Sequence, residues 1–199
     1  MARIVKTTDE RGNTLIEDPP IARFLFSNTK TAWLWLVVRV WLGWQWIEAA
    51  EHKVFDPAWV GGGEALKAYW ERALAIGPNG KSAIAFDWYR GFIQVLYDNQ
   101  AWTWFAPIIA WAELLIGVAL ILGAFTGLAA FGGSLMNWSF VMAGTASTNM
   151  LMFAVAALVI LAWKVAGWYG LDRWLLPAIG TPWEAGRIRI VRQAHPTRV

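Results

Sequence analysis

Residues 31–48 (TAWLWLVVRVWLGWQWIE) and 104–124 (WFAPIIAWAELLIGVALILGA) decide the fold of this chain, because each stretch is apolar enough to cross a bilayer. Each carries a charged residue near its middle, Arg39 in the first and Glu113 in the second. An ionised side chain at bilayer depth costs roughly 2.5–3.5 kcal/mol, so it is usually paired or faces an internal cavity. We therefore expect Arg39 and Glu113 to form an intramembrane ion pair inside a helix bundle. Such a pair either takes part in function or only fixes the register of the helices.

The composition indicates a membrane protein. Of 199 residues, 57% are hydrophobic, the mean hydropathy is +0.40, and there are 16 Trp residues, which favour the membrane interface. Cysteine is absent, which excludes disulfides, thiolate metal sites and dithiol relays. The two histidines, His52 and His195, have no metal-ligand spacing, so we expect no metal.

Four membrane spans are predicted, at about residues 32–50, 104–124, 127–143 and 150–168. The fold class is thus an all-α integral membrane protein, a bundle of four transmembrane helices. Lys and Arg collect before the first span and after the fourth, which places both termini in the cytoplasm. No compact basic face with stacking aromatics is apparent, so a nucleic-acid partner is not expected.

The chain divides into three parts. Residues 1–30 form a cytoplasmic segment in which RIVKTT and TLIE flank DERGN, a pattern typical of a β-hairpin. Residues 31–176 form the membrane domain, including an external segment, 51–103. Two amphipathic helices are predicted in that segment, with Leu66, Trp70 and Leu74 on one stripe and Trp88, Phe92 and Leu96 on the other. They either close the bundle like a lid or anchor in the interface. Residues 177–199 form a basic tail, and RIRIVRQ (187–193) could pair with the hairpin.

A polar stripe follows one face of the first span. Trp41, Gln45, Glu48 and His52 recur at steps of four, three and four residues, running toward the outer surface. We expect Asn137 of the third span and Asn149 of the fourth to converge on the same end. Carboxylate, imidazole and amide groups beside aromatic rings can serve a quinone, which needs hydrogen bonds to two carbonyl oxygens, a flat apolar slot and a proton route. The alternative is a polar network that only packs the helices.

Three blocks of the chain resemble the DoxX/DoxD family: RVWLG (39–43) continuing to EAAEHK (48–53), AELLIGVALILGAFTGLAA (112–130), and AGWYGLDRWL (166–175). The resemblance covers about residues 30–176. It implies a multi-pass protein of a prokaryotic cell membrane, linked to quinone-dependent sulfur oxidation. DoxD-type members form a thiosulfate:quinone oxidoreductase with a small DoxA subunit and convert thiosulfate to tetrathionate. Other members have accessory roles, so the fold alone transfers function poorly.

The resemblance also implies a site. Thiosulfate is a dianion and needs cationic groups near the outer mouth, for which His52, Lys53 and Arg90 are the candidates. Quinone is then a diffusible substrate that arrives through the lipid, with Glu48 or His52 accepting protons and no metal or flavin required. The alternative function is a non-catalytic membrane subunit that scaffolds a larger respiratory or redox complex. The expected partners are the lipid bilayer and either a DoxA-like subunit or such a complex, while self-association into a homo-oligomer stays open.

Overall fold

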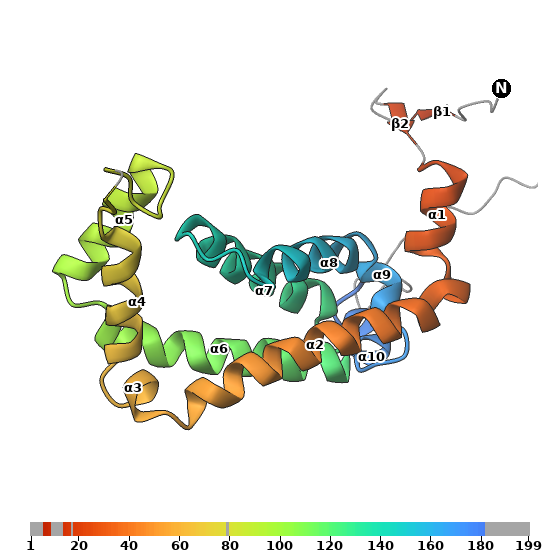
Figure 1. Cartoon of the computed structure of the whole chain (residues 1–199). Helices are drawn as coiled ribbons and strands as arrows, with labels where there is room; N and C mark the ends of the chain where they lie inside the picture. Colours follow the sequence, from red (N-terminus) through yellow and green to blue (C-terminus); the bar gives the residue numbers. More distant parts are fainter. Residues whose placement is uncertain (1–5, 9–13, 17, 79, 182–199) are drawn as a thin grey trace, which may run out of the picture.

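The computed structural model describes residues 6–8, 14–16, 18–78 and 80–181, and almost all of their regular structure is helical (Figure 1). Three long helices, α2, α6 and α7, and a shorter one, α8, lie along a common direction. The strands are β1 (Lys6–Thr8) and β2 (Thr14–Ile16), and the helices are α1 (Pro20–Ser27), η1 (Thr29–Thr31), α2 (Ala32–Val54), α3 (Pro57–Val60), α4 (Glu64–Leu74), α5 (Asp87–Asp98), α6 (Trp102–Leu122), α7 (Thr126–Met142), α8 (Asn149–Leu161), α9 (Trp163–Ala166) and α10 (Asp172–Ala178).

The predicted N-terminal hairpin is confirmed. Strands β1 and β2 pair antiparallel, with Lys6 opposite Ile16, Thr7 opposite Leu15 and Thr8 opposite Thr14. The predicted C-terminal strand, 187–193, lies outside the described residues. Its pairing with the hairpin stays a prediction.

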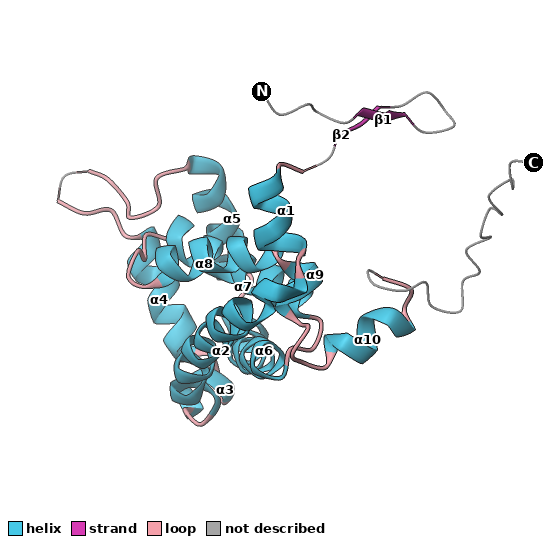
Figure 2. Cartoon of the chain, turned by 90° about the vertical axis from the view of Figure 1, so that its right-hand side faces the viewer, coloured by secondary structure: helices cyan, strands magenta, loops and turns pink. Residues whose placement is uncertain are grey.

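Helices α2 and α6 pack side by side along much of their length, and α7 packs against α8 (Figure 2). The α2–α6 contact is close because glycines meet there: a Cβ added to Gly43 would lie 2.8 Å from the carbonyl oxygen of Gly117. Small residues that let backbones approach are typical of helix packing in membranes. Since Gly43 faces Gly117 and Ala50 packs with Ala110, the two helices run antiparallel.

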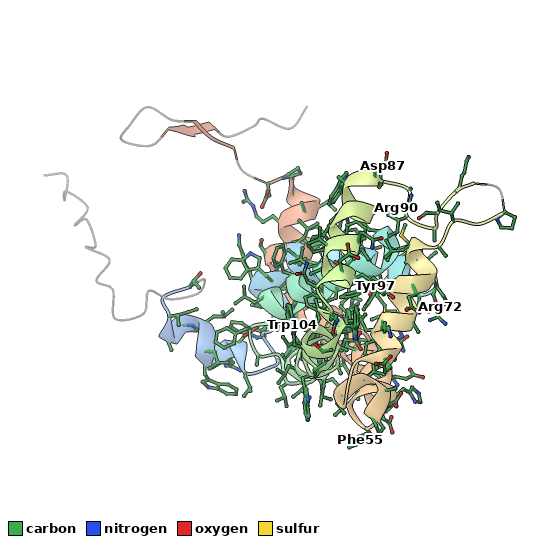
Figure 3. The ribbon with its side chains drawn as sticks, turned by 90° about the vertical axis from the view of Figure 1, so that its left-hand side faces the viewer. Phe55, Arg72, Asp87, Arg90, Tyr97 and Trp104 are labelled. Carbon is green, nitrogen blue, oxygen red and sulfur yellow. The ribbon has the colours of Figure 1, made fainter. Side chains whose placement is uncertain are left out.

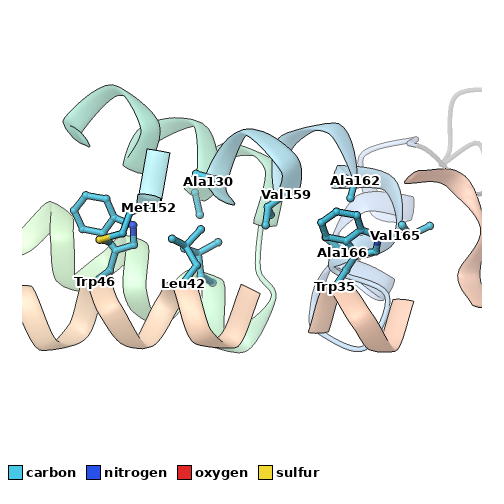
Figure 4. Close-up of a cluster of buried hydrophobic side chains, with 12 residues drawn as sticks. Trp35, Leu42, Trp46, Ala130, Met152, Val159, Ala162, Val165 and Ala166 are labelled. Atoms are coloured by element: carbon cyan, nitrogen blue, oxygen red, sulfur yellow. The ribbon is translucent and has the colours of Figure 1, made fainter. Parts of the chain in front are cut away.

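The main core lies between these two helix pairs (Figure 4). Trp35, Leu42 and Trp46 project from α2 at steps of seven and four residues, so they share one helical face. They pack against small and medium side chains of α7, α8 and α9, among them Ala130, Met152, Val159, Ala162 and Val165. Large indole rings on one side thus fill the space left by small residues on the other.

The predicted spans match helices, but their lengths differ. Within the part of the chain that the structure describes, α6 is the helix that is both long and apolar enough to cross a membrane. Helix α2 has 23 residues but carries several charged ones, α7 has 17 residues, and α8 has 13. The fourth predicted span, 150–168, is divided at Ala162, where α8 ends and the four-residue α9 follows. The all-helical architecture is confirmed, and insertion of four spans stays a prediction.

Residues 51–103 hold the two predicted helices, α4 and α5, beside a second apolar core. Leu66, Trp70 and Leu74 are buried there, as their spacing predicts. The predicted stripe of α5 is wrong in part: Tyr89 and Ile93 are buried, whereas Trp88 and Phe92 are 60% and 49% exposed. The helix is turned so that the hydroxyl of Tyr89 reaches a backbone carbonyl on α7, that of Ser139, at 2.9 Å.

Candidate functional site

Arg39 is buried, with 1% of its surface exposed, at the end of the bundle that carries α9 and α10. Its guanidinium donates hydrogen bonds to three backbone carbonyls: Leu120, Ile121 at 2.8 Å and Tyr169 at 2.9 Å. The first two belong to the last turn of α6, whose carbonyls have no partner within the helix. Arg39 therefore closes the end of α6 and ties it to the segment after α9.

The predicted ion pair between Arg39 and Glu113 is wrong. In the antiparallel register of α2 and α6, Arg39 lies beside Leu120 and Ile121, about two helical turns from Glu113. At 1.5 Å per residue this is roughly 11 Å along the helix axis, too far for a direct contact. Arg39 and Glu113 each lie near the middle of a predicted span. They still lie at different heights along the bundle, because α2 and α6 begin and end at different heights.

Asp172 completes the structure around Arg39. Its carboxylate is fully buried and accepts hydrogen bonds from the backbone N–H groups of Phe125 at 2.5 Å and Thr126 at 2.9 Å. These groups begin α7, where a negative charge is favourable because of the helix dipole. The Arg39 and Asp172 side chains thus fix the α6–α7 turn.

Glu113 pairs instead with Lys53, near the opposite end of the bundle. The Lys53 Nζ atom lies 2.6 Å from both carboxylate oxygens, and the Glu113 side chain is 1% exposed. The same ammonium group lies over the rings of Trp59, 5.0 Å from the centroid, and Phe140, at 5.4 Å. Helices α2, α3, α6 and α7 therefore supply one charged pair walled by aromatic rings.

Helices α7 and α2 present buried polar atoms that have no partner among the described residues. They are both side-chain atoms of the Asn137 amide, the hydroxyl of Ser134 and the indole N–H of Trp46. Asn137 is fully buried and lies one helical turn before Phe140, the ring that contacts Lys53. The Trp46 indole lies against α7 at Gly133, where a Cβ would approach its nitrogen to 2.9 Å. Burying such groups without hydrogen bonds costs roughly 1–3 kcal/mol each, so this is where a polar ligand gains most.

Two tyrosines hold helices α4 and α5 over this end of α7. The Tyr69 hydroxyl lies 2.9 Å from the hydroxyl of Thr145, and the Tyr89 hydroxyl donates to the Ser139 carbonyl. Burial raises the pKa of both tyrosines, so their hydroxyls stay protonated at neutral pH. The hydrogen bond from Tyr97 to Glu71, at 2.6 Å, raises the pKa of Tyr97 and links α5 to α4. Helices α4 and α5 thus cover the end of the bundle near the Lys53–Glu113 pair.

The predicted polar stripe of α2 lies on an exposed side of the helix. Trp41 is 39% exposed, Glu48 and His52 are exposed, and Gln45 is half-buried and donates a 3.4 Å hydrogen bond to Glu48. Asn137 faces the interior instead, so the expected convergence with this stripe is not found. Asn149 is half-buried and donates to the carbonyl of Thr145 at 3.2 Å.

The three predicted anion-binding residues are also separated. Lys53 is engaged by Glu113, whereas His52 is exposed in the last turn of α2. Figure 3 shows Phe55, which follows α2, at the lower edge of the molecule and Arg90, on α5, well above it. These side chains therefore do not form a single cationic cluster.

The described residues contain no group of three or more His, Asp or Glu side chains that could hold a metal ion. No protein-family model, curated protein or solved structure matches the chain. The likeness to the DoxX/DoxD family therefore stays an inference from the sequence blocks alone.

Sequence reasoning missed Trp46, Trp59, Ser134 and Phe140 and assigned Lys53 to an anion site. One signal was available: Ser134 and Asn137 are polar residues three apart in an otherwise apolar helix, so they share a face.

Proposed function

We propose that the chain is an integral membrane protein with four spans formed by α2, α6, α7 and the α8–α9 segment. Only 28% of an 18-residue apolar stretch of α6 is buried inside the protein, whereas the core helix of a soluble protein is mostly buried. Large exposed side chains follow the outside of α6, for example Trp111 at 51% and Leu115 at 65%. A soluble monomer rarely exposes such a continuous apolar surface, whereas a bilayer covers it.

We propose further that this protein is the membrane subunit of a quinone-linked oxidoreductase, with thiosulfate as the best candidate donor. The observation that supports this most is the amide of Asn137, which is fully buried, has no hydrogen-bond partner among the described residues, and lies one helical turn before Phe140, the ring that contacts Lys53. An apolar, aromatic-lined interior with a few polar groups is the usual character of a ligand site. The proposed quinone site therefore lies in the bundle interior, and not on the exposed stripe of Glu48 and His52 that the sequence predicted.

Each residue of this site has a role that its chemistry permits. The Asn137 amide donates a hydrogen bond to one quinone carbonyl, and the Lys53 ammonium donates to the other. Glu113 accepts and passes on protons, and its charge is balanced by Lys53 while the site is at rest. The rings of Trp59 and Phe140, which already contact the ammonium, pack against the flat quinone ring.

The reaction balances without a resident cofactor. Two thiosulfate ions join through a new sulfur–sulfur bond to give tetrathionate and release two electrons. One quinone takes up these two electrons and two protons and becomes quinol. The donor follows from the resemblance to DoxD-type proteins.

The test is thiosulfate-dependent reduction of a short-chain ubiquinone by the purified protein in nanodiscs. We expect Glu113→Gln and Asn137→Leu to lower turnover at least tenfold, while Glu48→Gln and His52→Ala, on the exposed stripe, retain most of it. Folding of each variant is checked by size-exclusion chromatography and thermal unfolding. If Glu48→Gln and His52→Ala lose turnover while Glu113→Gln and Asn137→Leu retain it, the quinone site lies at Glu48 and His52 instead. A folded protein that reduces no quinone with any sulfur donor supports the scaffold function instead.

A further inference from the structure

Helix α5 carries an apolar stripe that is largely exposed. Trp88, Phe92 and Val95 are 60%, 49% and 59% exposed and follow one another at steps of four and three residues. At 100° per residue, these three side chains share one face of the helix. The face is separate from the one that Tyr89 and Ile93 bury against the rest of the protein.

This stripe is continuous with the exposed apolar side of α7. The rings of Trp88 and Trp138 stack with their centroids 6.2 Å apart and an interplanar angle of 22°. Trp138 ends a row on α7 that begins with Leu128 and continues through Phe131 and Leu135, all at least 40% exposed. The stacked rings thus join a row along the proposed span α7 to a row along α5.

The polar side chains of α5 lie on a different face. Asp87, Gln94 and Asp98 are exposed, and their spacing of seven and four residues places them together, about a quarter turn from the apolar stripe. Figure 3 shows Asp87 and Arg90 on α5, at some distance from Trp104. Helix α5 also runs crosswise to α2 and α6, at one end of the bundle (Figure 1).

We propose that α5 lies in the outer membrane interface with its apolar stripe against the lipid acyl chains. This inference rests on the four-span part of the proposed function. When the bundle stands along the membrane normal, a crosswise helix at its end lies parallel to the bilayer surface. An amphipathic helix in that position buries its apolar face about 5–10 Å into the headgroup and acyl boundary, and Trp residues favour this depth. The Trp88–Trp138 stack then marks the level at which the span meets the interface.

The chain has no cysteine, so single Cys substitutions allow a clean test with spin labels. Phe92→Cys and Val95→Cys report on the stripe, and Gln94→Cys reports on the polar face of the same helix. Leu115→Cys, on the exposed side of α6, reports on insertion of the bundle itself. Each labelled protein is placed in nanodiscs, and its accessibility to oxygen, which concentrates in lipid, is compared with its accessibility to a water-soluble nickel chelate.

We expect positions 92 and 95 to favour oxygen, as position 115 does, and position 94 to favour the nickel chelate. High nickel accessibility at 92 and 95 with lipid exposure at 115 overturns the inference and leaves the span intact. Nickel accessibility at 115 as well shows that the proposed membrane insertion fails. Low accessibility to both reagents at 92 and 95, with dipolar broadening between labels, assigns the stripe to a second copy of the chain and also overturns the inference.

Discussion

The Lys53–Glu113 pair predicts a strongly non-additive double-mutant cycle. Lys53→Met removes the ammonium and leaves the Glu113 carboxylate, 1% exposed, without a partner. Glu113→Leu removes the carboxylate and leaves Lys53, whose side chain is 19% exposed. The double variant replaces both charges with apolar groups of similar volume.

The expected magnitudes follow from burial. Lys53→Met, which leaves the buried Glu113 carboxylate without a partner, lowers the free energy of unfolding by about 3–5 kcal/mol. Glu113→Leu, which leaves Lys53 without a partner, lowers the free energy of unfolding by less, about 1–3 kcal/mol, because the long lysine side chain can extend its ammonium toward water. The double variant lies within about 1 kcal/mol of the wild-type protein, or above it, since neither charge remains buried. The coupling energy is therefore about 3 kcal/mol or more.

The measurement is reversible unfolding in bicelles, followed by circular dichroism. A matched cycle combines Arg39→Met with Glu113→Leu. Because these residues lie about two helical turns apart, their effects add within about 0.5 kcal/mol. Additive losses in the Lys53–Glu113 cycle, or strong coupling in the Arg39–Glu113 cycle, would refute the pairing described above.

Three further outcomes are expected. Arg39→Met lowers the free energy of unfolding by about 3 kcal/mol or more, because three backbone carbonyls lose a charged donor, and Arg39→Lys restores only part of this stability. Equal stability of all three proteins contradicts this. Gly123→Ala destabilises more than Gly80→Ala in the same unfolding assay: both have positive φ, but only at Gly123 does a Cβ approach Arg39, to 2.7 Å from Cζ. Reporter fusions after Gly61 and after Arg192 report opposite sides of the membrane, and labelling from one side rules out the four-span topology.

Local patterns predicted the elements of this chain well. The periodic stretches gave α4, α6 and α7 to within a few residues, and Gly12 and Asn13 between alternating segments gave the hairpin. The buried stripe of α4 also followed from its spacing. These features depend on residues close together in sequence, which is why one sequence contains them.

The candidate site could not be predicted in the same way, because it depends on how helices align. Relative to the predicted alignment, α2 and α6 are shifted by about two helical turns. This shift separates Arg39 from Glu113 and places Lys53 beside Glu113. That shift is set by the contact of Gly43 with Gly117, which no periodicity shows. Likewise, a helical wheel groups Gln45 with Glu48 but does not say which face of α2 meets α7. The buried face is the one with Trp46, because large rings fit against Gly133 and Ala130.

The most direct test of the proposed site is equilibrium binding of a short-chain ubiquinone to the protein in nanodiscs, without any electron donor. Asn137→Leu is compared with Asn149→Leu, because the first amide is buried without a partner and the second already bonds to Thr145. We expect Asn137→Leu to weaken binding about tenfold, the loss of one hydrogen bond in an apolar site, with unchanged or higher stability. Asn149→Leu should bind as the wild-type protein does. Equal affinity of the wild-type protein and Asn137→Leu would contradict the account.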